Sequence, residues 1–168
     1  PDGDLLDGEL AQNINFIFWA DDGDNVLENG EEIFDQGTAQ DVLDNKFQTL
    51  GSPKVSLGKE IQWHQDFKSG KSWPLKNSRS LDLLDLGNSS DVKVPWELSR
   101  FHQVWWLGKA YWLTRNEDYP KKFAELVESW VGANPPGIGV NWAVGMEVAF
   151  RAANWIAGYY FFCESPSM

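Results

Sequence analysis

The sequence predicts a mainly α-helical domain that is preceded by a loop-rich segment. Residues 91–163 are densely apolar, and their apolar side chains recur at spacings of three, four and seven, as helices require. Residues 1–90 are rich in Gly, Asp, Asn and Ser and hold only short apolar runs. The length of 168 residues suits one globular domain, although such a domain seldom carries ten tryptophans for packing alone.

Composition excludes several classes of function. The chain carries 25 acidic and 14 basic residues, and a net charge of −11 makes general nucleic-acid binding improbable. One cysteine excludes an internal disulfide framework, and two histidines cannot form a three-histidine zinc site. We therefore expect no metal and no cofactor. Residues 143–163 are as long as a membrane span, but Glu147, Arg151 and Asn154 argue against one.

Only short elements are expected in the first half. An apolar run at 15–19 is typical of a short strand, and Thr38 is placed to cap a short helix ending at Asn45. An acidic stretch beginning at Asp22 suggests calcium, but Leu27 stands where an EF-hand needs glycine. A solvated acidic loop is the better interpretation.

The second half predicts three helices. The first begins near Pro95, and the second begins at Asp118 and ends at Gly132. Their apolar faces would carry Leu98, Phe101, Trp105 and Trp112 in the first, and Phe123, Val127, Trp130 and Val131 in the second. The third, at about 142–162, is apolar on nearly every side, which indicates burial among other helices. The chain offers too few helices to surround it, so we expect a continuation of the fold or a partner to cover it.

One polar stripe interrupts the third helix. Glu147, Arg151 and Asn154 are spaced by four and three residues and therefore share a face. An intrahelical ion pair beside a buried amide would explain them, and so would a groove in which they meet a ligand. Asn141 and Trp142 precede this helix, whose free backbone N–H groups would favour an anion.

Two further clusters combine aromatic and polar side chains. Trp63 and His64 begin a stretch that suits stacking and hydrogen bonding to sugar rings, although a loop pinned by its tryptophans would look the same. Trp96 precedes Glu97 and Arg100, which share a helical face near a helix start. These two charged groups can either fix the loop or face a substrate.

Several strings form a familiar ordered set. They are I-Q-W-H-Q-D-F at 61–67 with W-P at 73–74, K-V-P-W-E-L-S-R-F at 93–101, N-P-P at 134–136, V-N-W at 140–142 and M-E-V-A-F-R-A-A-N-W at 146–155. In this order they resemble the N-terminal region of the heparinase II/III family, bacterial lyases that cleave uronic-acid-containing polysaccharides. The resemblance spans about residues 39–162.

This resemblance implies an architecture and a reaction. The family has an incomplete (α/α) toroid followed by a β-sandwich, with substrate between them, so residues 39–168 would begin the toroid and residues 1–38 would be an acidic loop-rich segment. Its reaction is β-elimination on heparin-, heparan-sulfate- or alginate-like chains. The implied partners are an acidic polysaccharide, the remaining toroid helices and the β-sandwich, with no nucleic acid and no membrane span, and the parent protein would be periplasmic or secreted.

The resemblance assigns no catalytic residue to this chain. The family's catalytic Asn, Tyr and His lie beyond the matched region, so this part alone is expected to be inactive. It would supply cleft wall and substrate contacts, for which the expected residues are Trp63, His64, Trp96, Glu97, Arg100, Asn141, Trp142, Glu147 and Arg151.

Two other functions stay open, and the net charge of −11 would repel a polyanionic substrate. One is a non-catalytic carbohydrate-binding or structural helical module. The other is a toroid glycoside hydrolase with Glu97 and Glu147 as paired carboxylates. Local cations can still form a positive cleft on an acidic protein, and the candidates are Lys68, Lys71, Lys93, Arg100 and Arg151.

Overall fold

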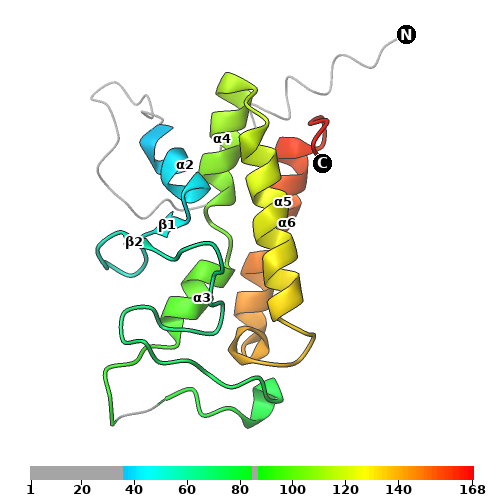
Figure 1. Cartoon of the computed structure of the whole chain (residues 1–168). Coiled ribbons are helices and arrows are strands. Elements are labelled where there is room, and N and C mark those ends of the chain that lie inside the picture. Colours follow the sequence, from blue (N-terminus) through cyan, green and yellow to red (C-terminus); the bar gives the residue numbers. More distant parts are fainter. Residues whose placement is uncertain (1–35, 85–86) are drawn as a thin grey trace, which may run out of the picture. The chain divides into compact units, whose positions relative to one another are not determined.

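A computed structural model describes residues 36–84 and 87–168 (Figure 1). The chain divides into two units, Pro1–Ile33 and Phe34–Met168, and every described element belongs to the second. In chain order the elements are α2 (Gln36–Leu43), β1 (Lys46–Phe47), β2 (Val55–Ser56), the 3-10 helix η2 (Ser78–Ser80), α3 (Lys93–Ser99), α4 (Val104–Thr114), α5 (Asp118–Ala133), the 3-10 helix η3 (Val140–Trp142) and α6 (Gly145–Phe162). The mainly α-helical prediction is confirmed. The expected strand at 15–19 and the acidic loop at Asp22 lie outside the described residues.

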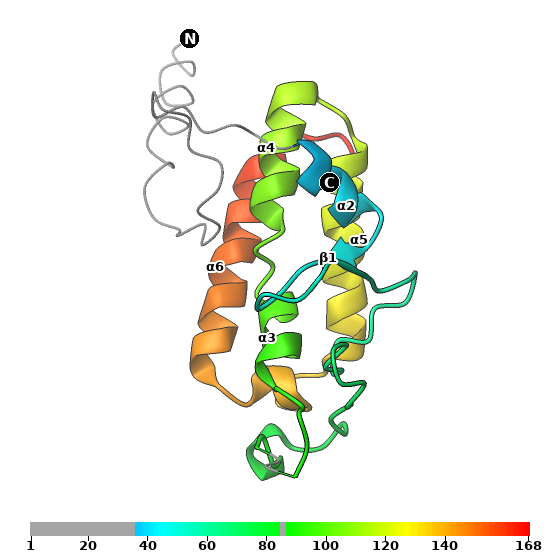
Figure 2. The ribbon, with the colours of Figure 1, turned by 90° about the vertical axis from the view of Figure 1, so that its left-hand side faces the viewer.

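Helices α4, α5 and α6 form the body of this unit. Helix α4 packs against both α5 and α6, and α2 lies against α4 and α5. Figure 2 shows α6 and α5 on opposite sides of a column formed by α3 and α4. Strands β1 and β2 pair antiparallel, with Lys46 opposite Ser56 and Phe47 opposite Val55.

Much of the tryptophan content serves packing. The Trp63 ring stacks on Phe101 at 5.6 Å between centroids, and Trp130 meets Trp155 edge to face at 5.4 Å. Buried indoles need a partner for their N–H group. Trp63 donates to Ser129 Oγ at 3.0 Å. Further indole bonds run from Trp105 to Asn154, from Trp112 to the Phe161 carbonyl and from Trp130 to Ser99.

The first predicted helix is two helices in the structure. It begins at Lys93, so Pro95 is its third residue, and it is broken between α3 and α4 at Phe101, whose φ of 63° is left-handed. Phe101 is fully buried between the rings of Trp63 and Trp155. Tertiary packing of this ring therefore outweighs the local cost of a left-handed backbone, which the helical spacing did not reveal.

Three details of the other predicted helices also differ. Thr38 lies inside α2, which begins at Gln36, so it is not the cap of that helix, and α2 ends at Leu43. Helix α5 begins at Asp118, whose backbone N–H donates to Asn116 Oδ1 at 3.0 Å. Val131 is 53% exposed and does not share the buried face of α5.

Helix α6 buries its polar stripe and exposes much of its apolar surface. Its buried residues are Glu147, Arg151, Asn154, Gly158, Phe161 and Phe162. Among its exposed side chains are Met146, Ile156, Tyr159 and Tyr160. Within the described residues this helix is therefore not surrounded on all sides. The exposure of apolar surface is as the sequence predicted.

Close contact of α4 with α6 depends on a glycine, and this predicts the effect of two substitutions. A Cβ at Gly108 would lie 2.2 Å from the Phe161 ring, whereas a Cβ at Gly132 meets nothing within 4 Å. We expect Gly108→Ala to lower the free energy of unfolding by about 1–3 kcal/mol through overpacking. The matched control Gly132→Ala should be neutral or stabilising by up to about 1 kcal/mol. Urea unfolding measures both, and equal effects of the two would contradict the packing.

Candidate functional site

The predicted site residues gather around η3, where α3 and α6 meet. Helix α3 and α6 each pack against η3 and against one another. Trp96 Nε1 donates to the Val140 carbonyl at 3.0 Å, and Asn141 Nδ2 donates to the Trp63 carbonyl at 2.8 Å. We call this region the η3 junction; its predicted members are Trp63, His64, Trp96, Glu97, Arg100, Asn141, Trp142, Glu147 and Arg151.

An arginine with two carboxylates is the electrostatic centre of the η3 junction. Arg100 Nε and Nη2 donate to the two oxygens of Glu147 at 2.6 and 2.7 Å, a bidentate geometry. Its Nη1 bonds Glu97 on the same helical turn. Glu147 stands in the first turn of α6, where the helix dipole also favours a negative charge. Arg100, and not Arg151 as one interpretation had it, is therefore the ion-pair partner of Glu147.

Glu97 is the more accessible carboxylate of this cluster. Its side chain is 25% exposed, against 1% for Glu147. Burial raises the pKa of Glu97, the attraction of Arg100 opposes the rise, and repulsion by Glu147 adds to it. The guanidinium also lies over the Phe150 ring at 5.0 Å. Glu97 and the edge of Arg100 are thus the charged groups of this cluster that solvent reaches.

Arg151 is enclosed by two indoles. Its guanidinium carbon lies 4.0 Å from the Trp130 ring centroid and 5.1 Å from that of Trp142, and its residue is 3% exposed. Nη2 donates to the Asn141 carbonyl at 3.2 Å. Burial lowers the pKa of Arg151 to about 10, with Glu147 opposing the shift. In the described part of the chain no carboxylate lies within ion-pair distance of it, so the stacked rings are its main support.

A short chain of buried amides ties the loop after α5 to this centre. Asn141 Nδ2 reaches Asn134 Oδ1 at 2.9 Å, and Trp142 Nε1 donates to the Asn134 carbonyl at 3.1 Å. Asn134 Nδ2 in turn caps α5 by donating to the Trp130 carbonyl at 2.8 Å. In the sequence Asn134 stands out only as the start of the N-P-P string at 134–136. A polar residue next to two prolines was the available signal that its side chain closes a loop.

His64 also holds the loop after α5 in place. Its Nε2 lies 3.0 Å from the Ala133 carbonyl oxygen, a contact in which only the nitrogen can donate. The ring also packs on Gly139, where a Cβ would lie 2.5 Å from it and where φ is +85°. A nitrogen that donates to a carbonyl is not free to act as a base. The role of His64 as a substrate contact stays a prediction.

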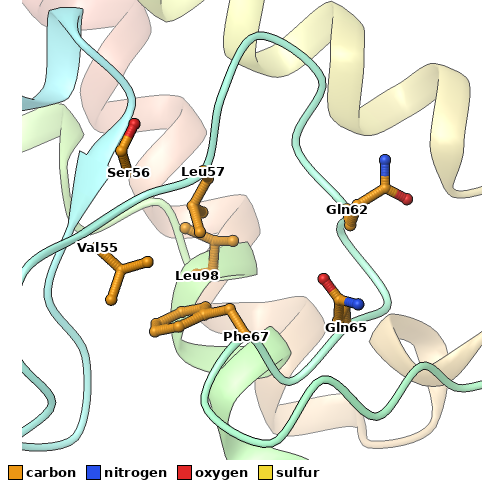
Figure 3. A pocket seen from close by; sticks show the side chains of 7 residues that line it. All are labelled: Val55, Ser56, Leu57, Gln62, Gln65, Phe67 and Leu98. Atoms are coloured by element: carbon orange, nitrogen blue, oxygen red, sulfur yellow. The ribbon is translucent and has the colours of Figure 1, made fainter.

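A small cavity opens beside the η3 junction. Its volume is about 240 Å³, and Figure 3 shows its lining. Four apolar side chains form one part of the wall and the amides of Gln62 and Gln65 form another. The lining residues are Val55, Ser56, Leu57, Gln62, Gln65, Phe67 and Leu98. The wall carries no charged side chain, so the cavity suits a neutral group.

Asp66 organises the turn that follows the Trp63 loop of the junction. It is 1% exposed and accepts bonds from the backbone N–H groups of Lys68, Ser69 and Asp91 at 2.8, 3.3 and 3.0 Å, and from Ser69 Oγ at 2.6 Å. Burial alone would raise the pKa of Asp66, but these bonds outweigh it and hold the pKa below its usual value. In the sequence Asp66 is one residue of the string at 61–67, and nothing there indicates its role in the turn.

Residues 36–84 and 87–168 contain neither a candidate metal site nor a candidate membrane-spanning helix. Across these residues, His, Cys, Asp and Glu side chains form no group of three that could hold a metal ion. None of the helices described there combines the length and the apolar character needed to cross a membrane.

Comparison with known proteins decides the family. Residues 20–168 match the family described as Heparinase II/III N-terminus. The chain belongs to this family. The sequence-based resemblance is thereby confirmed.

Two solved structures share the fold. One is the heparan sulfate lyase HepC from Pedobacter heparinus, with a TM-score of 0.61 and 20% identity over 84% of this chain and 21% of that one. The other is a HepC mutant from the same organism, with a TM-score of 0.60 and 22% identity over 84% and 20%. This heparinase II/III N-terminal region thus spans about one fifth of the length of those chains. No curated protein sequence matches it.

The Arg100 cluster predicts unequal effects of removing its charges. Arg100→Gln leaves the buried Glu147 carboxylate unpaired, and we expect a loss of about 3–5 kcal/mol in the free energy of unfolding. Glu147→Gln should cost less, because Arg100 keeps Glu97. The double variant should lose less than the sum of the two. Lys121→Gln, which removes an exposed pair at 4.0 Å, is the control and should change stability by less than about 0.5 kcal/mol. Additive losses in denaturant unfolding would contradict the pairing.

Asp66 predicts a pH-dependent effect. Because its folded pKa lies below the unfolded value, the ionised form stabilises the fold above about pH 4, and this stabilisation is lost as the pH falls further. Asp66→Asn should therefore cost about 1–3 kcal/mol at pH 7, and the deficit should shrink below pH 4. Unfolding of both proteins across pH 3–7 measures it. The exposed Asp82→Asn is the control, and a deficit for Asp66→Asn that does not depend on pH would overturn the argument.

Proposed function

We propose that this chain is the N-terminal part of a polysaccharide lyase that cleaves uronic-acid-containing chains by β-elimination. The observation that carries the proposal is the family match over residues 20–168. The fold shared with a heparan sulfate lyase supports it. In this proposal the described unit supplies a wall and substrate contacts, and the elimination chemistry is supplied elsewhere in the protein.

The geometry of the η3 junction supports two roles for the predicted residues, one in positioning the junction and one in contacting the sugar chain. Trp63, Asn141, Glu147 and Arg151 are each at most 3% exposed and bond or stack with one another or with neighbouring loops. These four would position the junction. The half-buried members His64, Trp96, Glu97, Arg100 and Trp142 are the ones that a sugar chain can reach, with indole faces for stacking and charged groups for hydroxyls and acidic substituents.

The requirements of β-elimination explain why this unit alone should be inactive. The uronate carboxylate must be neutralised, the C5 proton removed and the O4 leaving group protonated. Neither histidine presents a base at the surface of the described unit, because His64 Nδ1 and His102 Nε2, which have no hydrogen-bond partner there, are both buried. Tyr111 is 3% exposed and its hydroxyl donates to Glu117.

The contacts of Arg100 argue against the hydrolase alternative. Paired hydrolytic carboxylates stand on either side of a glycosidic bond, one of them as an acid and the other as a base or nucleophile. Glu97 and Glu147 instead share one guanidinium, and Glu147 is 1% exposed. The Arg100 guanidinium therefore occupies the space between the two carboxyl groups, where a hydrolase would need to hold a sugar.

The proposed activity predicts a specific product. A longer form of the protein that includes this chain, incubated with heparan sulfate, heparin, hyaluronan and alginate, should generate the ultraviolet absorbance of an unsaturated uronate on at least one of them. Residues 1–168 alone should generate none. New reducing ends without this absorbance would identify a hydrolase, and no product on any substrate would favour a binding module. Turnover by residues 1–168 would place catalysis on the residues described here.

A further inference from the structure

One segment of this acidic domain carries several exposed cations and no carboxylate. Residues 67–81 contain Lys68, Lys71, Lys76 and Arg79 and no acidic residue, in a chain whose net charge is −11. Three of these cations, Lys68, Lys76 and Arg79, are exposed and form no ion pair with any described residue. We call residues 67–81 the basic strap. The cations expected from sequence to bind an anion include Arg100 and Arg151, but Arg100 is neutralised by two carboxylates and Arg151 is enclosed.

The basic strap is held rigidly against the η3 junction. Trp73 is 6% exposed, its backbone N–H donates to the His64 carbonyl at 2.9 Å, and it packs with Val92 and Val140. Further along, Ser78 N–H donates to the Gly137 carbonyl and Gly139 N–H to the Lys76 carbonyl, at 2.9 and 2.8 Å.

These anchors set where the cations lie. Asn77 forms a bridge with Ile138, and its Oδ1 accepts the Arg79 N–H at 3.0 Å. Exposed cations therefore alternate with buried anchors. Figures 1 and 2 show the strap at the end of the domain where α3 and α6 begin.

We propose that the basic strap is a binding surface for an acidic polysaccharide, in addition to the contacts of the η3 junction. Several exposed cations on a fixed backbone bind a flexible polyanion with little ordering cost on the protein side. A local positive surface on a negative protein also directs the polyanion to this end of the domain. Of the nearby carboxylates, Asp66 is committed to hydrogen bonds, and Asp82 and Asp91 flank the strap without interrupting it.

The composition of the strap favours a polysaccharide over a nucleic acid. Binding of single strands relies on exposed aromatic rings on which bases stack. The strap has two aromatic residues: Trp73 is buried and Phe67, half-buried, lines the cavity of Figure 3. What the strap exposes is charge and aliphatic surface. The proposal rests on the proposed function only for its choice of polyanion.

Two matched variants test the strap in the 168-residue chain. Lys76→Gln with Arg79→Gln removes two strap charges, and Lys59→Gln with Lys121→Gln removes two exposed charges elsewhere, so both change the net charge equally. Heparin binding at 0.15 M NaCl should weaken at least about fivefold in the strap variant and less than twofold in the control. Lys76→Arg should bind like the unmodified chain. Equal melting temperatures for all the variants will show that the fold is intact.

Other outcomes would overturn the proposal. These are equal loss in both double variants, no loss in either, no heparin binding by the unmodified chain even at 0.05 M NaCl, or binding of single-stranded DNA as tight as that of heparin. The proposed lyase function is tested separately. If it fails, the longer protein forms no unsaturated product at all, whereas failure of the strap alone leaves product formation intact and the two double variants indistinguishable in binding.

Discussion

The bidentate pair between Arg100 and Glu147 is the contact on which the arrangement of the described unit depends. It joins the turn between α3 and α4 to the first turn of α6, across 47 residues of sequence. The same turn is held a second time, because Asn154 donates to the Arg100 carbonyl at 2.7 Å. A charge as deeply buried as Glu147 is stable only when it is fully paired, so the pair allows α6 to place its polar stripe inward.

Helix α6 consequently differs from an ordinary surface helix, because its polar stripe is buried and several of its large apolar side chains are exposed. Its inner face carries Glu147, Arg151 and Asn154. Glu147 bonds the α3–α4 turn, Arg151 bonds η3, and Asn154 bonds both that turn and Trp105. Directional contacts of this kind specify one arrangement, because a partly satisfied buried network is costly. The residues that surround the η3 junction are thus held by hydrogen bonds and stacked rings, which suits a surface that must present indoles and charges at fixed positions.

The cations of this domain differ in burial and in function. Arg151 is buried and Arg100 is paired with two carboxylates, so both stabilise the fold, whereas Lys68, Lys76 and Arg79 of the basic strap are exposed. A protein with an excess of eleven negative charges can still attract a polyanion if its free cations lie together and away from its carboxylates. The strap lies beside the η3 junction, so in the proposed function charge attraction and ring stacking would act at the same end of the domain.

The helical class, the stops around α5 and the family resemblance follow from the sequence alone, because periodicity, turn residues and ordered strings are local features. It also indicated which polar residues belong together, since Glu147, Arg151 and Asn154 share a face by spacing alone. Only the tertiary structure decided their partners. The choice of Arg100 over Arg151 for Glu147, the left-handed backbone at Phe101 and the enclosure of Arg151 by Trp130 and Trp142 all arise between segments far apart in the chain. Local spacing carries no information on such contacts, because their energy comes from desolvation and packing that exist only once the helices have met.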